Sequence, residues 1–333
     1  MLGARSNARS FELFGLGAIL LCAFALRVVY VTWGLPGYVF PDSLLHLIRP
    51  AARIVADGDF TLSQSQFFHP PVLVYATSGV YWFWSLLGGQ PVASSGAAFQ
   101  AQLPTLVLLG RGLQLFVALL SIVVLFRLAR RLIGSRGALF ASAAFALAPI
   151  HVLESHRLHP DGLMTLWILL ASDWAVAARD RRSLRSLWPA FAVAGLAGAT
   201  KYVGLFAGAV PAWIALTWHG TDARRRTRLV FAGGVVALAG FAVGMAPALF
   251  HMDRFLFALR LFAHVGFVSG APGYDLAGES WASMRFVYAL LVALPFALGW
   301  PVYLAGLAGL PVLQRRARFA FGVVLAFVVP YFL

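Results

Sequence analysis

Long apolar runs are the feature of this sequence that most constrains its fold. A helix needs about 20 consecutive, mostly apolar residues to cross a hydrocarbon core of about 30 Å. Such runs recur along the chain, at 11–33, 104–126, 137–153, 161–178, 202–218, 229–250 and 284–311, with weaker candidates at 187–200 and 319–333. The sequence therefore predicts an all-α fold, a polytopic transmembrane bundle of about nine spans that forms one domain over residues 1–333.

Composition excludes the water-soluble classes of protein. Only 11% of the residues are charged and 61% are hydrophobic, whereas a soluble domain has roughly 25% charged residues. The net charge of +14 is then explained by loop arginines that face anionic headgroups. No pattern typical of nucleic-acid-binding modules is present. We expect membrane lipids among the partners and no nucleic acid.

The loop arginines decide whether the apolar segment 71–88 crosses the membrane. Cytoplasmic loops are enriched in basic residues, so the topology that collects the arginines on one side is favoured. If 71–88 lies in the outer interface, the N-terminus and the arginine clusters at 127–136, 179–185, 224–228 and 315–318 all face the cytoplasm. If it crosses, those four clusters face outward. We therefore predict that 34–103 is the first outer loop and contains juxtamembrane helices.

The same topology gathers the titratable residues on the outer face. Asp42, Glu154 and Asp161 fall there, together with every histidine except His219. The inner face carries arginine and little else. This asymmetry predicts a functional site at the outer surface of the membrane.

The first outer loop opens with a helix start that carries a carboxylate. Pro41 and Asp42 suit the first turn of a helix, and the i,i+4 spacing places His46 on the same face as Asp42. Asp42 has two interpretations, a helix cap or a general base held at the membrane surface. Downstream, Asp57-Gly58-Asp59 is typical of a helix stop and turn.

His69 stands immediately before a proline pair, Pro70-Pro71, at the expected start of the interfacial helix. It is interpreted either as a solvated interfacial histidine or as a substrate ligand.

The connection between the third and fourth spans is unusually polar. Glu154, His156, Arg157, His159 and Asp161 crowd between two very apolar segments. Helix capping explains Asp161 in part, but it does not explain the other four. A polar cluster at the mouth of a helical bundle is a functional-site hypothesis. Metal ligation by the two acids and two histidines stays open, although their spacing matches no specific metal motif.

Lys201, the chain's one lysine, separates two apolar stretches. A charge at such a depth is costly unless it is paired or hydrated. Lys201 either extends its ammonium group to the outer interface or holds a phosphate there. Arg27, Arg111 and Asp173 also lie within spans and are expected to be paired or near an interface.

An ordered set of short motifs resembles the dolichyl-phosphate-mannose–protein mannosyltransferase-like proteins of glycosyltransferase family 39. The set runs over most of the chain and comprises Pro41-Asp42, Gly58-Asp59-Phe60, Phe68-His69-Pro70-Pro71, Leu103-Pro104, Ala129-Arg130-Arg131-Leu132-Ile133-Gly134, Arg157-Leu158-His159-Pro160-Asp161 and Thr200-Lys201-Tyr202. The resemblance implies the GT-C fold. It also implies a hexosyl- or pentosyltransferase that moves a sugar from a polyprenyl-phosphate donor to a lipid, glycan or protein acceptor.

The resemblance further implies roles for individual residues. Asp42 would deprotonate the acceptor hydroxyl, which displaces the lipid phosphate with inversion, and Lys201, Arg157 and His69 would hold that phosphate. Asp161 and Glu154 would orient the acceptor or bind a divalent metal ion. The family has an acidic pair in the first loop, and this chain has Ser43 at the second position, which implies either that Asp42 works alone or that activity is altered. The implied location is the bacterial inner membrane, with the site on the periplasmic face.

Two other classes of function stay open. A polytopic transporter or flippase fits the broken apolar stretches and the embedded charges, although no inverted repeat relates the two halves. A non-catalytic partner in envelope assembly fits the departure at Ser43. The last apolar run reaches Leu333 without a polar cap, which leaves open that the chain is part of a longer protein.

Overall fold

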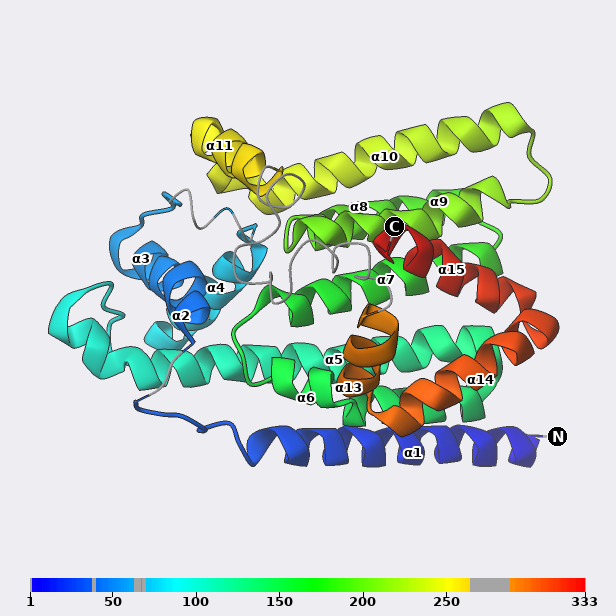
Figure 1. Cartoon of the computed structure of the whole chain (residues 1–333), viewed down its shortest axis with the longest axis horizontal. Coiled ribbons are helices and arrows are strands. Elements are labelled where there is room, and N and C mark those ends of the chain that lie inside the picture. Colours follow the sequence, from blue (N-terminus) through cyan, green and yellow to red (C-terminus); the bar gives the residue numbers. More distant parts are fainter. Residues whose placement is uncertain (1, 38–39, 63–66, 68–69, 264–287, 333) are drawn as a thin grey trace.

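The computed structural model describes residues 2–37, 40–62, 67, 70–263 and 288–332, and within these ranges every regular element is a helix (Figure 1). This confirms the predicted all-α fold. The α-helices are α1 (Leu2–Val28), α2 (Pro41–Ser43), α3 (Arg49–Asp57), α4 (Val72–Leu86), α5 (Gly96–Leu147), α6 (Pro149–Glu154), α7 (Pro160–Asp180), α8 (Trp188–Gly198), α9 (Ala209–Leu216), α10 (Ala223–Met245), α11 (Met252–Ala263), α13 (Leu294–Leu298), α14 (Trp300–Arg316) and α15 (Arg318–Phe332). Short 3-10 and π-helices are η1 (Leu44–Ile48), η3 (Leu184–Leu187), η4 (Tyr202–Gly208), η5 (Ala246–His251) and η8 (Ala289–Ala293).

The long helices run side by side along the long axis of the molecule (Figure 1). Helix α5 packs against α1 and α7, α7 packs against α8, and α8 packs against α10. Glycines allow the last of these pairs to approach closely, as in many helix pairs within membranes. A Cβ atom on Gly195 of α8 would lie 2.0 Å from the Ala237 carbonyl oxygen, and one on Gly240 of α10 would lie 2.2 Å from that of Ala192.

Helix α5 is two helices joined at a sharp turn. Gly134 has φ 78° and ψ 175°, a conformation that glycine adopts without the steric cost of a side chain. The segments before and after it contain the predicted spans 104–126 and 137–153. The arginine-rich connection predicted between those spans therefore includes this turn.

Four helical segments of the described chain are long and apolar enough to cross a membrane, or five if the bent pair Ala289–Leu298 and Trp300–Arg316 counts as one span. The predicted number of about nine spans is therefore not confirmed. The predicted span 202–218 forms a shorter apolar helix, Tyr202–Leu216, and 187–200 contributes an 11-residue helix, α8. The bent pair turns by 119° at Gly299.

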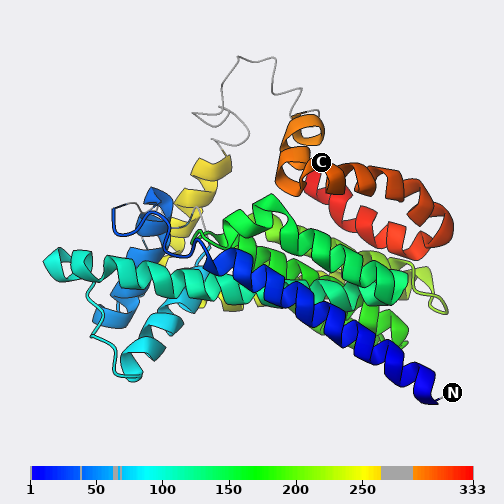
Figure 2. The same ribbon diagram turned by 90° about the horizontal axis from the view of Figure 1, so that it is seen from below.

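The helices of the predicted first outer loop gather at one end of the bundle, near α11 and the beginning of α5 (Figures 1 and 2). The segment predicted at 71–88 forms α4, which packs against η1 and α3. Tyr81 anchors α4 to the bundle, since its hydroxyl is fully buried and donates to the Leu106 carbonyl of α5 at 3.0 Å. As predicted, α3 ends at Asp57, with Gly58 in the left-handed conformation (φ 64°).

The opposite end holds the connections that carry the arginine clusters. The N-terminal part of α1, the α7–α8, α9–α10 and α14–α15 connections all lie there (Figure 1). The two ends thus differ in chemistry, as the arginine distribution predicts. The side of the membrane that each end faces stays a prediction.

Candidate active site

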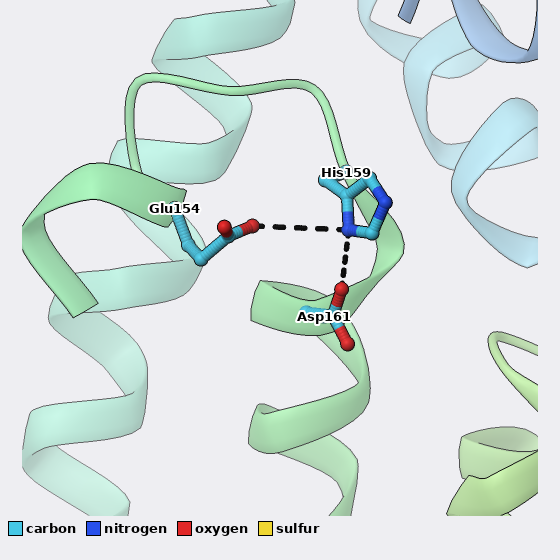
Figure 3. Close-up of side chains that lie close together, drawn as sticks. All are labelled: Glu154, His159 and Asp161. Atoms are coloured by element: carbon cyan, nitrogen blue, oxygen red, sulfur yellow. Dashed lines mark ion pairs between the residues drawn. The ribbon is translucent and has the colours of Figure 1, made fainter. Parts of the chain in front are cut away.

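Three side chains converge where α6 ends and α7 begins (Figure 3). Glu154 is the last residue of α6, His159 precedes α7, and Asp161 lies in the first turn of α7 after Pro160. The His159 Nδ1 atom forms an ion-pair contact with Asp161 and lies 3.8 Å from Glu154 Oε2. A proline at the first position of each helix fixes where that helix begins, so local sequence places both carboxylates around one short connection.

Lys201 completes this cluster from a distant part of the chain. Its Nζ atom donates to Asp161 Oδ1 at 2.8 Å, and both side chains are about one-third exposed, at 31% and 30%. Lys201 has extended backbone in the break between α8 and η4, which lets its side chain leave the helix packing. The Lys201 ammonium group is thus paired with a carboxylate inside a polar cluster. Whether it also holds a phosphate stays a proposal.

Arg157 lies on the Glu154 side of the cluster. Its Nη1 atom is 3.7 Å from Glu154 Oε1, and its guanidinium carbon lies 4.6 Å from the centre of the Phe40 ring. The Nε atom of Arg157 is buried without a hydrogen-bond partner in the described part of the chain. This N–H group is a donor whose hydrogen-bonding capacity is unused in the described structure.

The surroundings of Glu154 disfavour the ionised form of its carboxyl group. Burial raises the pKa of its carboxyl, and the nearby Asp161 adds to this, while His159, Arg157 and Lys201 oppose it. Its Oε2 atom is buried with no hydrogen-bond partner among the described residues. A carboxyl with a raised pKa and an unused acceptor atom is typical of a functional site.

The connection that carries these residues rests on α5. Leu158 packs over Gly110, where a Cβ atom would lie only 2.2 Å from its Cδ2 atom. Four residues further along the same face of α5, the buried Gln114 donates from Nε2 to the His159 carbonyl at 2.6 Å. The backbone of residues 158 and 159 is therefore fixed by shape and by a hydrogen bond.

The predicted base, Asp42, lies in the element that touches this connection from the other side. Helix α2 begins at Pro41 with Asp42 in its first turn, as the sequence predicts. Asp42 is exposed, whereas Ser43 is buried and donates from Oγ to the Leu158 carbonyl at 2.9 Å. His46 is half-buried in η1.

His69 lies outside the described residues. The neighbouring Phe67 accepts a hydrogen bond at its carbonyl from the Tyr202 hydroxyl at 2.8 Å. Phe67 therefore contacts the residue that follows Lys201.

The remaining histidines of the polar connection serve packing. His156 pairs through Nε2 with the Arg27 carbonyl at 2.7 Å, and His151 Nδ1 lies 2.9 Å from an Nη atom of the buried Arg27. His156 is not part of the group of acids and histidines whose ligand atoms lie close together in the described residues. Arg27 and Arg111 are both paired, Arg111 with the Val31 and Trp33 carbonyls.

A metal ion fits the remaining donor set. One ligand atom each from Glu154, His159 and Asp161 lies within 4.8 Å of the others. Two carboxylates and an imidazole suit a divalent ion such as Zn²⁺ or Mn²⁺. These three residues would hold it, with Lys201 continuing to neutralise Asp161.

Two residues of the site were missed in the sequence. Gln114 lies in an apolar span, and a buried amide four residues after a glycine at such a depth is a signal of helix contact. Phe40 gave no signal, because an aromatic residue before a helix is common. Their contacts with His159 and Arg157 depend on the tertiary fold.

Part of the chain matches a known protein family. Residues 109–246 match the family model described as dolichyl-phosphate-mannose-protein mannosyltransferase. The matched range contains Glu154, Arg157, Asp161 and Lys201, while Asp42 precedes it. A search of curated proteins found no match to the chain.

A solved structure shares the fold over most of the chain. An archaeal oligosaccharyltransferase, AglB from Archaeoglobus fulgidus in complex with an inhibitory peptide and a dolichol-phosphate, superposes with a TM-score of 0.54 at 15% identity, over 91% of this chain and 39% of that chain. Another structure, of the Archaeoglobus fulgidus oligosaccharyltransferase in complex with Zn and sulfate, has a TM-score of 0.46 at 16% identity, over 96% of this chain and 48% of that chain. The chain thus spans less than half of either structure.

The family match and the fold of the first of these structures give the class. The chain is similar to the GT-C membrane glycosyltransferases. Within that class, its matched segment resembles the dolichyl-phosphate-mannose–protein mannosyltransferases, which confirms the resemblance based on the sequence motifs.

Proposed function

We propose that this protein transfers a sugar from a polyprenyl-phosphate donor to an acceptor hydroxyl at the outer face of a bacterial inner membrane. The observation that carries the proposal is the cluster of Glu154, Arg157, His159, Asp161 and Lys201 at one end of an apolar bundle, with α2 seated against it. A polyprenyl tail stays in lipid while its phosphate and sugar stay at the interface. A polar cluster at the end of the bundle suits both requirements.

Asp42 is proposed as the general base. Its exposed carboxylate takes the proton of the acceptor hydroxyl, and the oxygen attacks the anomeric carbon of the donor. A new carbon–oxygen bond forms while the bond from the anomeric carbon to the phosphate oxygen breaks. The phosphate keeps that electron pair, and the configuration at the anomeric carbon inverts.

Lys201 and Arg157 are proposed to hold the leaving phosphate. The Lys201 ammonium uses one donor toward Asp161 and has two further N–H groups. Arg157 adds its guanidinium group, whose side chain is 35% exposed. Donors that are fixed before the reaction stabilise the charge that develops on the leaving group, and each is typically worth a factor of about 10²–10³ in rate.

Asp161, Glu154 and His46 are proposed to orient the substrates, with His69 as an additional phosphate ligand. Asp161 also holds Lys201 in place. If a divalent ion binds Glu154, His159 and Asp161, it would supply Lewis-acid neutralisation of phosphate charge.

The test uses the full chain in membranes with a panel of polyprenyl-phosphate sugars. We expect the wild type to consume one donor and form a glycosylated product, and Asp42→Asn to abolish that product. The matched control is Asp57→Asn, which removes an exposed carboxylate from the same loop and should leave transfer unchanged. Asp161→Asn should also lose transfer.

Two results would contradict the proposal. The first is a wild type that consumes no donor while a deletion strain keeps its envelope glycans, which favours a non-catalytic envelope partner. The second is substrate flux across the membrane that survives Asp42→Asn. That flux would favour the transporter hypothesis, for which the 119° bend between α13 and α14 is the supporting observation.

A further inference from the structure

Ser43 joins two segments that are far apart in the sequence. It follows Asp42 directly, is only 6% exposed, and donates its hydroxyl hydrogen to the Leu158 carbonyl at 2.9 Å. Leu158 lies 115 positions later. It stands between Arg157 and His159, so a single hydrogen bond connects the residue after the proposed base to the connection that carries the proposed phosphate ligands.

The acceptor carbonyl is itself held in place. Leu158 is 3% exposed and packs over Gly110. The next carbonyl, that of His159, accepts a hydrogen bond from Gln114. On the α2 side, Phe40 lies under the Arg157 guanidinium. The Ser43 hydroxyl therefore binds α2 to a rigid backbone position.

We propose that Ser43 is a positioning residue, which fixes Asp42 relative to Arg157, Asp161 and Lys201 so that the base and the phosphate ligands act on one donor molecule. This proposal rests on the proposed function and deepens it. Helix α2 continues without a break through η1 into α3, so Asp42 stands in the first turn of a longer helical run, the turn that meets residues 157 and 158. The Ser43 hydrogen bond to the Leu158 carbonyl and the contact of Phe40 with the Arg157 guanidinium hold this first turn against the connection.

The chemistry of this contact requires a hydroxyl group. A carbonyl oxygen accepts only, so its partner must donate, and an ionised carboxylate has no hydrogen to donate. An acidic residue at position 43 would place a second acceptor against the Leu158 carbonyl in a buried setting, which is costly. An ionised carboxylate at position 43 would therefore lose the α2 contact in this chain, whereas Ser43 supplies the hydrogen-bond donor.

The kinetic test compares three substitutions at position 43 in the purified full chain in lipid nanodiscs. Ser43→Ala should lower kcat by about 3- to 10-fold, the range that corresponds to the loss of one hydrogen bond, while the KM for the donor changes less than about twofold. Ser43→Thr keeps the hydroxyl and should restore most of the rate. Ser43→Asp should be at least as impaired as Ser43→Ala, although it restores the acidic pair.

A second measurement reports the contact without any activity. Leu45 and Leu153 are exposed, next to α2 and in α6. Spin labels on Leu45→Cys and Leu153→Cys, with Cys22→Ser to remove the native thiol, measure the distance between the two segments. We expect a narrow distance distribution in the wild-type background and in Ser43→Thr, and a broader one in Ser43→Ala and Ser43→Asp.

The two readouts separate this proposal from the proposed function. If the wild type transfers no sugar, the proposed function fails, and the distance distributions still test whether Ser43 positions α2. Unchanged distributions in Ser43→Ala would overturn the positioning role. So would wild-type kcat in Ser43→Ala, or a gain of activity in Ser43→Asp.

Discussion

The two ends of the bundle both carry mixed clusters of acids and cations, but their geometry differs. At the arginine-rich end, Asp173 is fully buried and accepts from Arg127 at 2.8 Å and from Arg131 at 3.0 Å. Arg131 also reaches Asp180 at 3.0 Å. Each of these contacts has the distance of a charge-assisted hydrogen bond, and both oxygens of Asp173 are used.

In the cluster at the opposite end, the hydrogen bonds of the charged side chains are less complete. The Glu154 contacts with Arg157 and His159 measure 3.7 and 3.8 Å, and the cluster's side chains are between 16% and 35% exposed. The buried Glu154 Oε2 and Arg157 Nε atoms have no hydrogen-bond partner in the described ranges. The comparison teaches that the charged side chains of one bundle differ in how completely their hydrogen bonds are made, and the less complete cluster is the one proposed to bind substrate.

The largest effect in the comparison of the two ends should follow from removing Lys201, one of the cations of the open cluster. Lys201→Met is expected to lower transfer by about 10²–10³-fold, because a fixed donor to the leaving phosphate is lost. Lys201→Arg keeps the charge and should recover part of the rate. Steady-state kinetics measures both.

The control at the other end is Arg136→Met, which removes an exposed cation and should leave transfer unchanged. Equal losses in Lys201→Met and Arg136→Met would show that the two ends do not differ in function.

A large effect on stability should follow from the saturated cluster. Asp173→Asn leaves Arg127 and Arg131 without their buried carboxylate. Removing one partner of a buried ion pair typically costs about 3–5 kcal/mol. Because the two arginines are 47% and 28% exposed, we expect about 2–3 kcal/mol, less than for fully buried partners.

Thermal unfolding in detergent measures this loss, with Asp180→Asn as the matched control, since Asp180 pairs with the same Arg131 but is 47% exposed. Activity per folded molecule should be retained in Asp173→Asn. Loss of activity without loss of stability would assign Asp173 to the reaction. It would contradict the proposed difference in role between the two ends of the bundle.

The smallest effect concerns pH and Glu154. Because burial raises the pKa of this carboxyl in the folded chain, the folded state keeps a proton that the unfolded state has released. The neutral Glu154 carboxyl therefore contributes fully to the stability of the folded chain below the ordinary glutamate pKa of about 4.3. This contribution is lost as the pH rises through the raised pKa of the folded chain.

The measurement is the Tm of the wild type minus that of Glu154→Gln, followed from acid to neutral pH. We expect this difference to fall by a few degrees at most. A difference that stays constant or rises with pH would mean that the cations around Glu154 outweigh its burial.

The sequence by itself determined the membrane class, the all-α fold, the starts of α2 and α7, and the concentration of acids and histidines in a few connections. These features follow from local patterns, because apolar runs, prolines in first helical turns and loop arginines act within one segment. The family resemblance was likewise read from short motifs and is confirmed over residues 109–246.

Tertiary structure alone decided which polar residues meet. Lys201 finds Asp161 across 40 positions, and Ser43 finds Leu158 across 115, whereas His156 turns to the Arg27 carbonyl. It also decided that the predicted span 202–218 begins as a 3-10 helix, η4, before it continues as α9, whereas the break at Lys201 was already expected from the sequence. The physical reason is that spacing along one helix predicts its own faces, while the partner of a side chain depends on how separate helices pack.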